Sequence, residues 1–447
     1  MATLNGVYQF YTVEQAQTHL QSLIANYTSP SLSFSTLFRQ VANGFFMAEG
    51  SITGTFRSQN SHWFKPYMSL SQNVSDASLS FFVILFFALN QTGSFRFTVT
   101  SAGNLHITLV TYSWDNIINI WIPYFNMVYG IKYNAFICMQ RIFILNSINT
   151  LEAAWESVHL AYALSRNAGQ FLLSLPAKLL AVGCVPGALP VPSTTFLPNN
   201  TPITLAYVLG FFLGDGHCWV RFRMRDTSLL IIPLFIITQK LSEVNLIILG
   251  QMKTLLNSLG ISAQVISVAR TKQINGKAID ASEARLVIEG LTSVLSQLLP
   301  QLLALQPFFF WKAPQLNVLV GVARYVTVSA HLLIPGLESL VRYLFSTHSV
   351  IGDTDNRVSL STIISFISTT MLDAANARTT TGHFMVNAEM SKHNSKLYRV
   401  RLPAFMNPKP KSKVFNVNSY GSASRALDDA IAYRDAAIKS WLSDNNL

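Results

Sequence analysis

Charged residues are scarce in this sequence, at 12% of 447 residues, while hydrophobic residues make up 50%. That balance would suit a membrane protein, but long uninterrupted apolar runs are missing as well. Leu79–Leu89 and Ser228–Thr238 are too short to span a bilayer, which takes about 20 residues. Asn116–Ile131 is longer but carries a proline and three asparagines. The sequence therefore predicts a protein without membrane spans.

Cysteine is rare too, and Cys138, Cys184 and Cys218 are far apart in the chain. Their spacing matches neither a zinc site nor an even disulfide framework, so we interpret them as core thiols in a reducing compartment. The first residues, Met1–Tyr8, lack the charged and apolar stretches of a secretory signal. They also lack the arginine-rich amphipathic pattern of a transit peptide.

Acidic residues are outnumbered by basic ones, 21 against 32, which leaves a formal net charge of +11. A surplus of this size favours a polyanionic partner or an anionic membrane surface. Composition alone does not separate the two.

Two short stretches, Val41–Gly50 and Leu205–Gly216, share one design. Each is typical of an apolar helix with two small residues four positions apart, which places them on one face, one turn from each other. Two such faces allow helices to cross with their backbones in close contact. The predicted contact residues are Gly44, Ala48, Gly210 and Gly214.

Each of these helices ends in a carboxylate followed by glycine, at Glu49 and Asp215. An acid in the last turn opposes the helix dipole at a cost of about 0.3–1 kcal/mol, so helix stability does not explain either acid. Taken alone, each stretch also fits a helix that stops in a tight glycine turn. If the helices cross side by side, the carboxylates meet at one end, where they can bind a hard divalent cation.

The segments after the two acids are also similar. Ser51–Gln59 and His217–Arg225 alternate with period two, which predicts strands with one apolar and one polar face. Further on, Ser71–Asp76 and Thr238–Glu243 each end an apolar strand and open a helix at a serine cap. The chain thus contains an internal duplication with a period of about 165 residues, which indicates two similar subdomains.

At these motifs the sequence resembles the LAGLIDADG homing endonucleases, in the single-chain form with two motif copies. The segments 44–50 and 210–216 stand where that family's signature stands, and the likeness extends over about residues 30–345. The resemblance implies an α+β fold with an αββαββα subdomain used twice. The motif helices would form the interface and antiparallel sheets a DNA-binding saddle. Met47 and Leu213 replace an earlier acid of the signature, a position that is not the family's metal ligand.

The same resemblance implies that Glu49 and Asp215 are the catalytic metal ligands, with Mg²⁺ or Mn²⁺ as cofactor. The enzyme would be a monomer with an internal pseudo-two-fold that cuts each strand of double-stranded DNA once, by metal-assisted hydrolysis. Lys132 stands in a lysine-containing turn and is either catalytic or an ordinary helix-end residue. Polar residues implied to act near the scissile phosphates, unless they serve only to end a strand, are Gln72, Gln239 and Lys240.

The strongest sign of DNA binding is Arg221, Arg223 and Arg225, which share one strand face. Three neighbouring like charges repel each other unless an anion lies opposite, although a solvated strand face is the alternative. Arginine can bind phosphates or read guanine, worth about 1–3 kcal/mol per good pair. The corresponding strand of the first repeat would read the other half of an asymmetric target, through Thr53, Thr55, Arg57 and Gln59.

Composition also divides the chain. Five prolines between Pro186 and Pro202 predict a stiff tether that lets one polypeptide bring both motif helices together. The predicted parts are an N-terminal extension (1–30), the first repeat (31–150), a linker (151–203), the second repeat (204–346), a helical connector (347–389) and a basic module (390–447).

The basic module has seven Lys or Arg and no acid from Met390 to Gly421, followed by an amphipathic helix. Two basic strands and a helix resemble the AP2-type DNA-binding module, which implies that Arg399 and Arg401 contact DNA. A basic disordered tail is the alternative.

Two other functions remain open. An RNA maturase that helps its own intron to fold uses the same scaffold, and a basic surface does not separate RNA from DNA. A DNA-binding protein that does not cleave would tolerate loss of either acid, so intact Glu49 and Asp215 favour the nuclease. Enzymes of this family are commonly encoded in organellar introns. The resemblance therefore implies a mitochondrial, alternatively chloroplast, origin.

Overall fold

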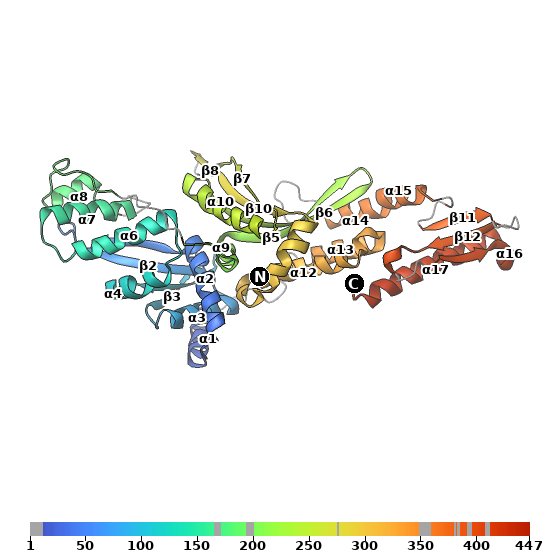
Figure 1. Cartoon of the computed structure of the whole chain (residues 1–447), viewed down its shortest axis with the longest axis horizontal. Helices are drawn as coiled ribbons and strands as arrows, with labels where there is room; N and C mark the ends of the chain where they lie inside the picture. Colours follow the sequence, from blue (N-terminus) through green and yellow to red (C-terminus); the bar gives the residue numbers. More distant parts are fainter. Residues whose placement is uncertain are drawn as a thin grey trace. The chain divides into compact units, whose positions relative to one another are not determined.

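The computed structural model describes residues 12–164, 171–193, 201–274, 277–347, 359–379, 381, 385–390, 396–406 and 412–447, without the side chains of 272–279 (Figure 1). These residues form two compact units. The first consists of 1–217, 235–288 and 301–314, and the second of 218–234, 289–300 and 315–447. Within the described part of the chain, no helix is both long and apolar enough to cross a membrane.

The first repeat is built on a four-stranded antiparallel sheet. Its strands lie in the order β1-β2-β4-β3, with the longest strands in the middle. Because β2 and β4 alternate buried and accessible residues, one face of the sheet is apolar and the other polar. Its elements are α1 (Val13–Ala25), α2 (Leu32–Glu49), β1 (Ser51–Phe56), β2 (Phe64–Asn73), α3 (Asp76–Ala88), β3 (Ser94–Val99) and β4 (Leu105–Thr111).

The second repeat follows the same order of elements, and its sheet has the order β5-β6-β10-β7. An additional hairpin, β8 with β9, lengthens it. Two four-stranded sheets, each preceded by a motif helix, confirm the predicted α+β fold class. The elements are α9 (Leu205–Asp215), β5 (Gly216–Arg225), β6 (Ser228–Lys240), α10 (Glu243–Ser258), β7 (Gln264–Val268), β8 (Thr271–Ile274), β9 (Lys277–Asp280) and β10 (Glu283–Glu289).

The segment between the repeats begins with two helices, which precede the prolines of the predicted tether. Its helices α7 (Leu151–Leu164) and α8 (Leu175–Ala181) follow α6 (Gly130–Leu145) and pack with it in the first unit (Figure 1). The indole N–H of Trp155 donates to the carbonyl oxygen of Pro190 at 3.0 Å. Pro190 is therefore bound to α7, and its neighbour Leu189 packs against the apolar cluster around Trp155 and Leu179.

Helices complete the second repeat and lead into the C-terminal module. Within the predicted helical connector, 347–389, residues 360–377 are helical, and α14 packs on α13. The elements between β10 and the module are π-helix Leu291–Leu298, α11 (Leu299–Leu303), 3-10 turns Gln306–Phe308 and Phe310–Lys312, α12 (Ala313–Thr327), 3-10 turn Ala330–Leu332, α13 (Ile334–Ser346), α14 (Leu360–Phe366), π-helix Ile367–Met371 and α15 (Leu372–Ala377).

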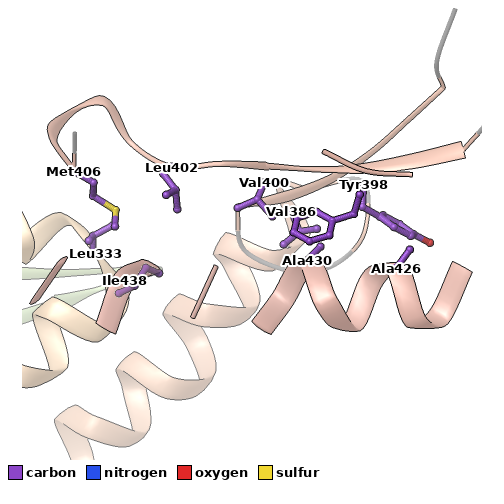
Figure 2. Packing of buried hydrophobic residues seen from close by; sticks show 10 residues of the cluster. Leu333, Val386, Tyr398, Val400, Leu402, Met406, Ala426, Ala430 and Ile438 are labelled. Carbon is purple, nitrogen blue, oxygen red and sulfur yellow. The ribbon is translucent and has the colours of Figure 1, made fainter. Parts of the chain in front are cut away.

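The C-terminal module is a three-stranded antiparallel sheet on one long helix, α17 (Ala423–Asp444). Figure 2 shows Val386, Tyr398 and Val400 of the sheet packed on alanines of this helix. A disordered tail is thus wrong for the described residues, although Lys409 and Lys411 lie outside them. The sheet strands are β11 (Val386–Met390), β12 (Lys396–Arg401) and β13 (Ser412–Asn416), followed by the short helix α16 (Val417–Tyr420).

Candidate active site

The motif helices α2 and α9 cross at two glycines (Figure 1). A Cβ atom on Gly44 would collide with the carbonyl oxygen of Tyr207 and lie 2.8 Å from the backbone nitrogen of Phe211. A Cβ on Gly210 would collide in the same way with the carbonyl oxygen of Val41. The two backbones therefore touch, and only a residue without a side chain fits at either position.

This crossing brings the two acids to one end of the helix pair. A Cβ on Gly214 would lie 2.5 Å from Cβ of Ala48 and 3.4 Å from Oε1 of Glu49. The Glu49 side chain therefore extends over the last turn of the opposite helix, directly before Asp215. The structure thus brings together both predicted metal ligands and all four predicted contact residues.

The glycine after each acid has a steric role. Gly50 has φ −63° and ψ 140°, and Gly216 has φ −98° and ψ 158°, so both are extended. The alternative of a tight glycine turn is therefore wrong. A Cβ on Gly50 would lie 2.6 Å from the ring of Phe46, and one on Gly216 would collide with the ring of Phe212. At each site the helix passes directly into a strand, and the glycine at the junction lies against an aromatic ring from the preceding helical turn.

Burial raises the pKa of both acids, and for Asp215 the charge of Glu49 raises it further. The pKa of Asp215 rises to about 6, first because the carboxyl group is desolvated and second because of the charge of Glu49. A hydrogen bond from Gln239 opposes this rise. Desolvation likewise raises the pKa of Glu49 against the opposing charges of Lys132 and Lys312. Two carboxylates in such a place favour a bound cation over bound protons at neutral pH.

A buried lysine, Lys132, and a half-buried one, Lys312, lie behind the acids. Lys132 Nζ donates to the carbonyl oxygens of Phe46 and Met47, both at 2.6 Å, and Lys312 Nζ donates to that of Gly216 at 2.6 Å. Each lysine thus lies at the C-terminal end of a motif helix, where the dipole favours a positive charge. The repeat spacing did not predict Lys312, because the β8-β9 hairpin shifts this lysine along the chain.

The other predicted catalytic residues are placed unequally. Gln239 Nε2 donates to a carboxylate oxygen of Asp215. Gln72, at the matching end of β2, accepts a hydrogen bond from the backbone N–H of Asn73 at 2.8 Å. Lys240 is exposed, and its charge acts on Asp280, whose pKa is lowered chiefly by hydrogen bonds from Ser282. Of these three residues, Gln239 is therefore the one that binds a predicted metal ligand directly.

The donor set suits Mg²⁺. Among the described residues, no group of three or more His, Cys, Asp or Glu side chains could hold a metal ion. A pair of carboxylates is sufficient for Mg²⁺, which commonly takes one or two of them and keeps several water ligands. The oxygen ligands of Glu49 and Asp215 therefore fit this ion.

Neither a known protein family nor a curated protein matches the sequence. Solved structures do match. The I-LtrWI LAGLIDADG homing endonuclease bound to target DNA gives a TM-score of 0.51 at 15% identity, covering 72% of this chain and 99% of that one. The meganuclease I-SmaMI, bound to uncleavable DNA with a TTCT central four, gives 0.50 at 18% identity, covering 70% and 99%. The fold is that of a LAGLIDADG homing endonuclease. The C-terminal module adds a further sheet.

In this LAGLIDADG fold, β1 is shorter than predicted. It ends at Phe56, so Arg57 and Gln59 lie in the loop to β2, while Thr53 and Thr55 lie on the strand. The prediction failed because polar alternation continues past the strand into a Ser-Gln-Asn-Ser run. Side chains of that kind form turns as readily as they line a strand.

Strand pairing identifies more residues on the polar face of the first sheet. Thr53 pairs with Tyr67 and Thr55 with Lys65, so these four share a face. Arg96 of β3 pairs with Thr108 on the same face, and its guanidinium lies over the ring of Tyr112 at 4.9 Å. Alternation within Ser94–Val99 was the available signal for Arg96.

The other predicted DNA-binding arginines are in two places. On β5, Arg223 and Arg225 are exposed and Arg221 is half-buried. On β12, Arg399 and Arg401 both form ion pairs with Glu389, at 3.0 and 2.8 Å. Glu389 thus links the two basic side chains of the module.

Proposed function

We propose that this protein is a site-specific endonuclease that makes a double-strand break in a long, asymmetric DNA target by metal-assisted phosphodiester hydrolysis. One observation carries the proposal: two carboxylates, from separate repeats, meet at the end of helices that cross through glycine contacts. Two structures with this fold, which are bound to DNA, support it. A single chain with both repeats would act as a monomer.

Glu49 and Asp215 would hold Mg²⁺ or Mn²⁺. When bound, such an ion stabilises charge on the phosphate and lowers the pKa of a coordinated water. Gln239 orients the Asp215 carboxylate through its hydrogen bond. Lys132 and Lys312 favour the ionised form of the two acids and supply fixed positive charge where a phosphate would gain negative charge.

The two sheets would bind the two halves of the target. Polar and basic side chains cover the accessible face of the first sheet, and the arginines of β5 belong to the second. A two-stranded ribbon fits the major groove. Because the threonines of β1 and the arginines of β5 offer different hydrogen-bonding groups, the half-sites would differ.

The C-terminal module would add a second DNA contact through Arg399 and Arg401, as an AP2-like domain does. Its sheet carries both arginines on the face opposite Val400, which packs on α17. Ion pairing with Glu389 holds them in one orientation.

The test is incubation in Mg²⁺ with DNA that spans the uninterrupted insertion site of this reading frame. The proposal expects one double-strand cut at a defined position and no cut in a duplex of scrambled sequence. Binding without any cut would refute the nuclease. Specific binding to the intron RNA would then support the maturase alternative.

A further inference from the structure

Lys178 of α8 is a buried cation whose hydrogen bonds go to one loop. Its side chain is 2% exposed. Its Nζ donates to the carbonyl oxygens of Ser58, Gln59 and Ser61, each at 2.8 Å. The three N–H donors of the ammonium group are therefore used on three carbonyls within four residues.

A buried ammonium is an unfavourable choice for packing alone. Desolvation lowers the pKa of Lys178 to about 8, although the ring of Phe56 lies only 4.0 Å from Nζ. An apolar side chain would fill the same space without losing the hydration of a charge. The ammonium does what an apolar residue cannot do: it orients three carbonyl dipoles and so determines the path of the loop.

The loop, residues 57–63, joins β1 to β2 and is held from several sides. The backbone N–H of Arg57 donates to the carbonyl oxygen of Trp63 at 2.8 Å, which closes the base of the hairpin. Ser157 of α7 donates to the carbonyl oxygen of His62 at 3.3 Å. Both α7 and α8 therefore fix the loop, although they belong to the segment between the repeats.

This loop carries Arg57 and Gln59, which line a cavity of about 420 Å³ together with Thr55, Leu172 and Lys178. The loop follows the C-terminal end of β1, whereas Glu49 precedes its N-terminal end. A six-residue strand at about 3.3 Å per residue separates the loop from the acid by roughly 20 Å. Along B-DNA, with about 3.4 Å per base pair, this corresponds to about six base pairs.

From these contacts we infer that Lys178 is a positioning residue for sequence recognition. It fixes the β1-β2 loop so that Arg57 and Gln59 contact base pairs about six positions from the cleavage site, in one half-site only. The inference rests on the proposed function and assigns to the segment between the repeats a part in target selection.

The test is selection of duplex DNA from a randomised library by the full-length protein without divalent metal ions, followed by sequencing. Lys178→Met keeps the apolar contacts of the side chain but removes its charge and N–H donors. Arg141→Met is the matched control. It removes the same charge from the same compact unit, but Arg141 pairs with Glu156 of α7 at 2.7 Å and not with the loop.

We expect Lys178→Met to lose roughly tenfold in discrimination at the outer base pairs of one half-site, with the other half-site unchanged. The control should reproduce the wild-type profile. A wild-type profile from Lys178→Met overturns the inference and leaves the proposed function intact. Equal loss in both half-sites also overturns it, because it marks general destabilisation.

If the wild type enriches no duplex at all, the proposed function fails and the role of Lys178 fails with it. If Lys178→Met does not fold, as judged by thermal unfolding, Lys178→Gln takes its place with the same outcomes. Its neutral amide retains N–H donors but does not reach all three carbonyls.

Discussion

Gln239 donates a hydrogen bond to the carboxylate of Asp215, whereas its counterpart Gln72 binds the backbone of its own neighbour, Asn73. The two acids of the candidate site are therefore held differently, although they occupy equivalent positions in the two repeats. Asp215 has a neutral partner that orients it, while Glu49 extends over Gly214 of the other helix. The two acids thus differ in their partners, just as the two sheets differ in their polar side chains.

Asp215 makes the stability of the metal-free protein depend on pH. Its folded pKa of about 6 exceeds its ordinary value of 3.8, so the folded state binds more protons between these values. The contribution of this group to the free energy of unfolding is therefore greatest below pH 4 and is lost as the pH rises through 6. We expect Asp215→Asn to be more stable than the wild type at pH 7 by on the order of 2 kcal/mol.

Urea unfolding in EDTA at pH 5 and pH 7 measures this effect. Asp226→Asn, which removes the charge of an exposed carboxylate, is the control. Equal stability of Asp215→Asn and wild type at pH 7 would contradict the assigned burial and repulsion.

Lys132 should influence the pH dependence of cleavage. Its charge lowers the pKa of both Glu49 and Asp215. Lys132→Met is therefore expected to move the acidic limb of the pH–rate profile to higher pH. It should also destabilise the fold by about 1–3 kcal/mol, since two buried carbonyls lose their donor. Lys439→Met, at an exposed helix position, should change neither the pH–rate profile nor the stability. An unshifted acidic limb in Lys132→Met would show that this lysine acts only on the end of the helix.

The helix crossing predicts opposite effects of one substitution at two helical glycines. Gly44→Ala would place a methyl group against the carbonyl oxygen of Tyr207, and we expect a loss of about 3 kcal/mol or more. Gly250→Ala on α10 meets nothing within 4 Å, so it should stabilise by about 0.5–1 kcal/mol. Urea midpoints of the two variants test this. A mild effect of Gly44→Ala would mean that the helices are not in backbone contact.

Arg223 is expected to bind a phosphate or a base. If it neutralises one phosphate, Arg223→Ala should reduce the slope of log K against log salt concentration by about 0.9. If it reads a base, discrimination at one position should fall instead, by about 1–3 kcal/mol. Arg342→Ala, which removes a charge paired with Glu338 on α13, is the control. Filter binding across a salt series, with matched and mismatched duplexes, should show one of these two changes. If it shows neither, Arg223 does not belong to the DNA interface.

Much of this architecture could be predicted because it depends on short-range patterns. Small residues four positions apart predicted the helix contact, and period-two alternation predicted the strands after each acid. Lys312 and Lys178 could not be found in that way. Each binds backbone carbonyls of a distant segment, and carbonyls have no side-chain signature. The end of β1 at Phe56 was missed because polar alternation looks the same in a strand and in the turn that follows it.

The segment between the repeats shows the limit of reading proline as a sign of a tether. Pro190 accepts a hydrogen bond from Trp155, and the apolar residues of α7 and α8 hold that stretch against the first repeat. Proline prevents helix formation, but it does not prevent packing. Only contacts between residues far apart in sequence distinguish a free tether from a folded one.

The most direct test of the central claim is cleavage of the target duplex in Mg²⁺ by the wild type, Glu49→Gln and Asp215→Asn. Both substitutions keep side-chain size and remove one charge from the proposed metal site. We predict that all three proteins bind the duplex and that only the wild type makes a double-strand cut. Continued double-strand cutting by either variant would contradict the assignment of these two acids as the catalytic pair.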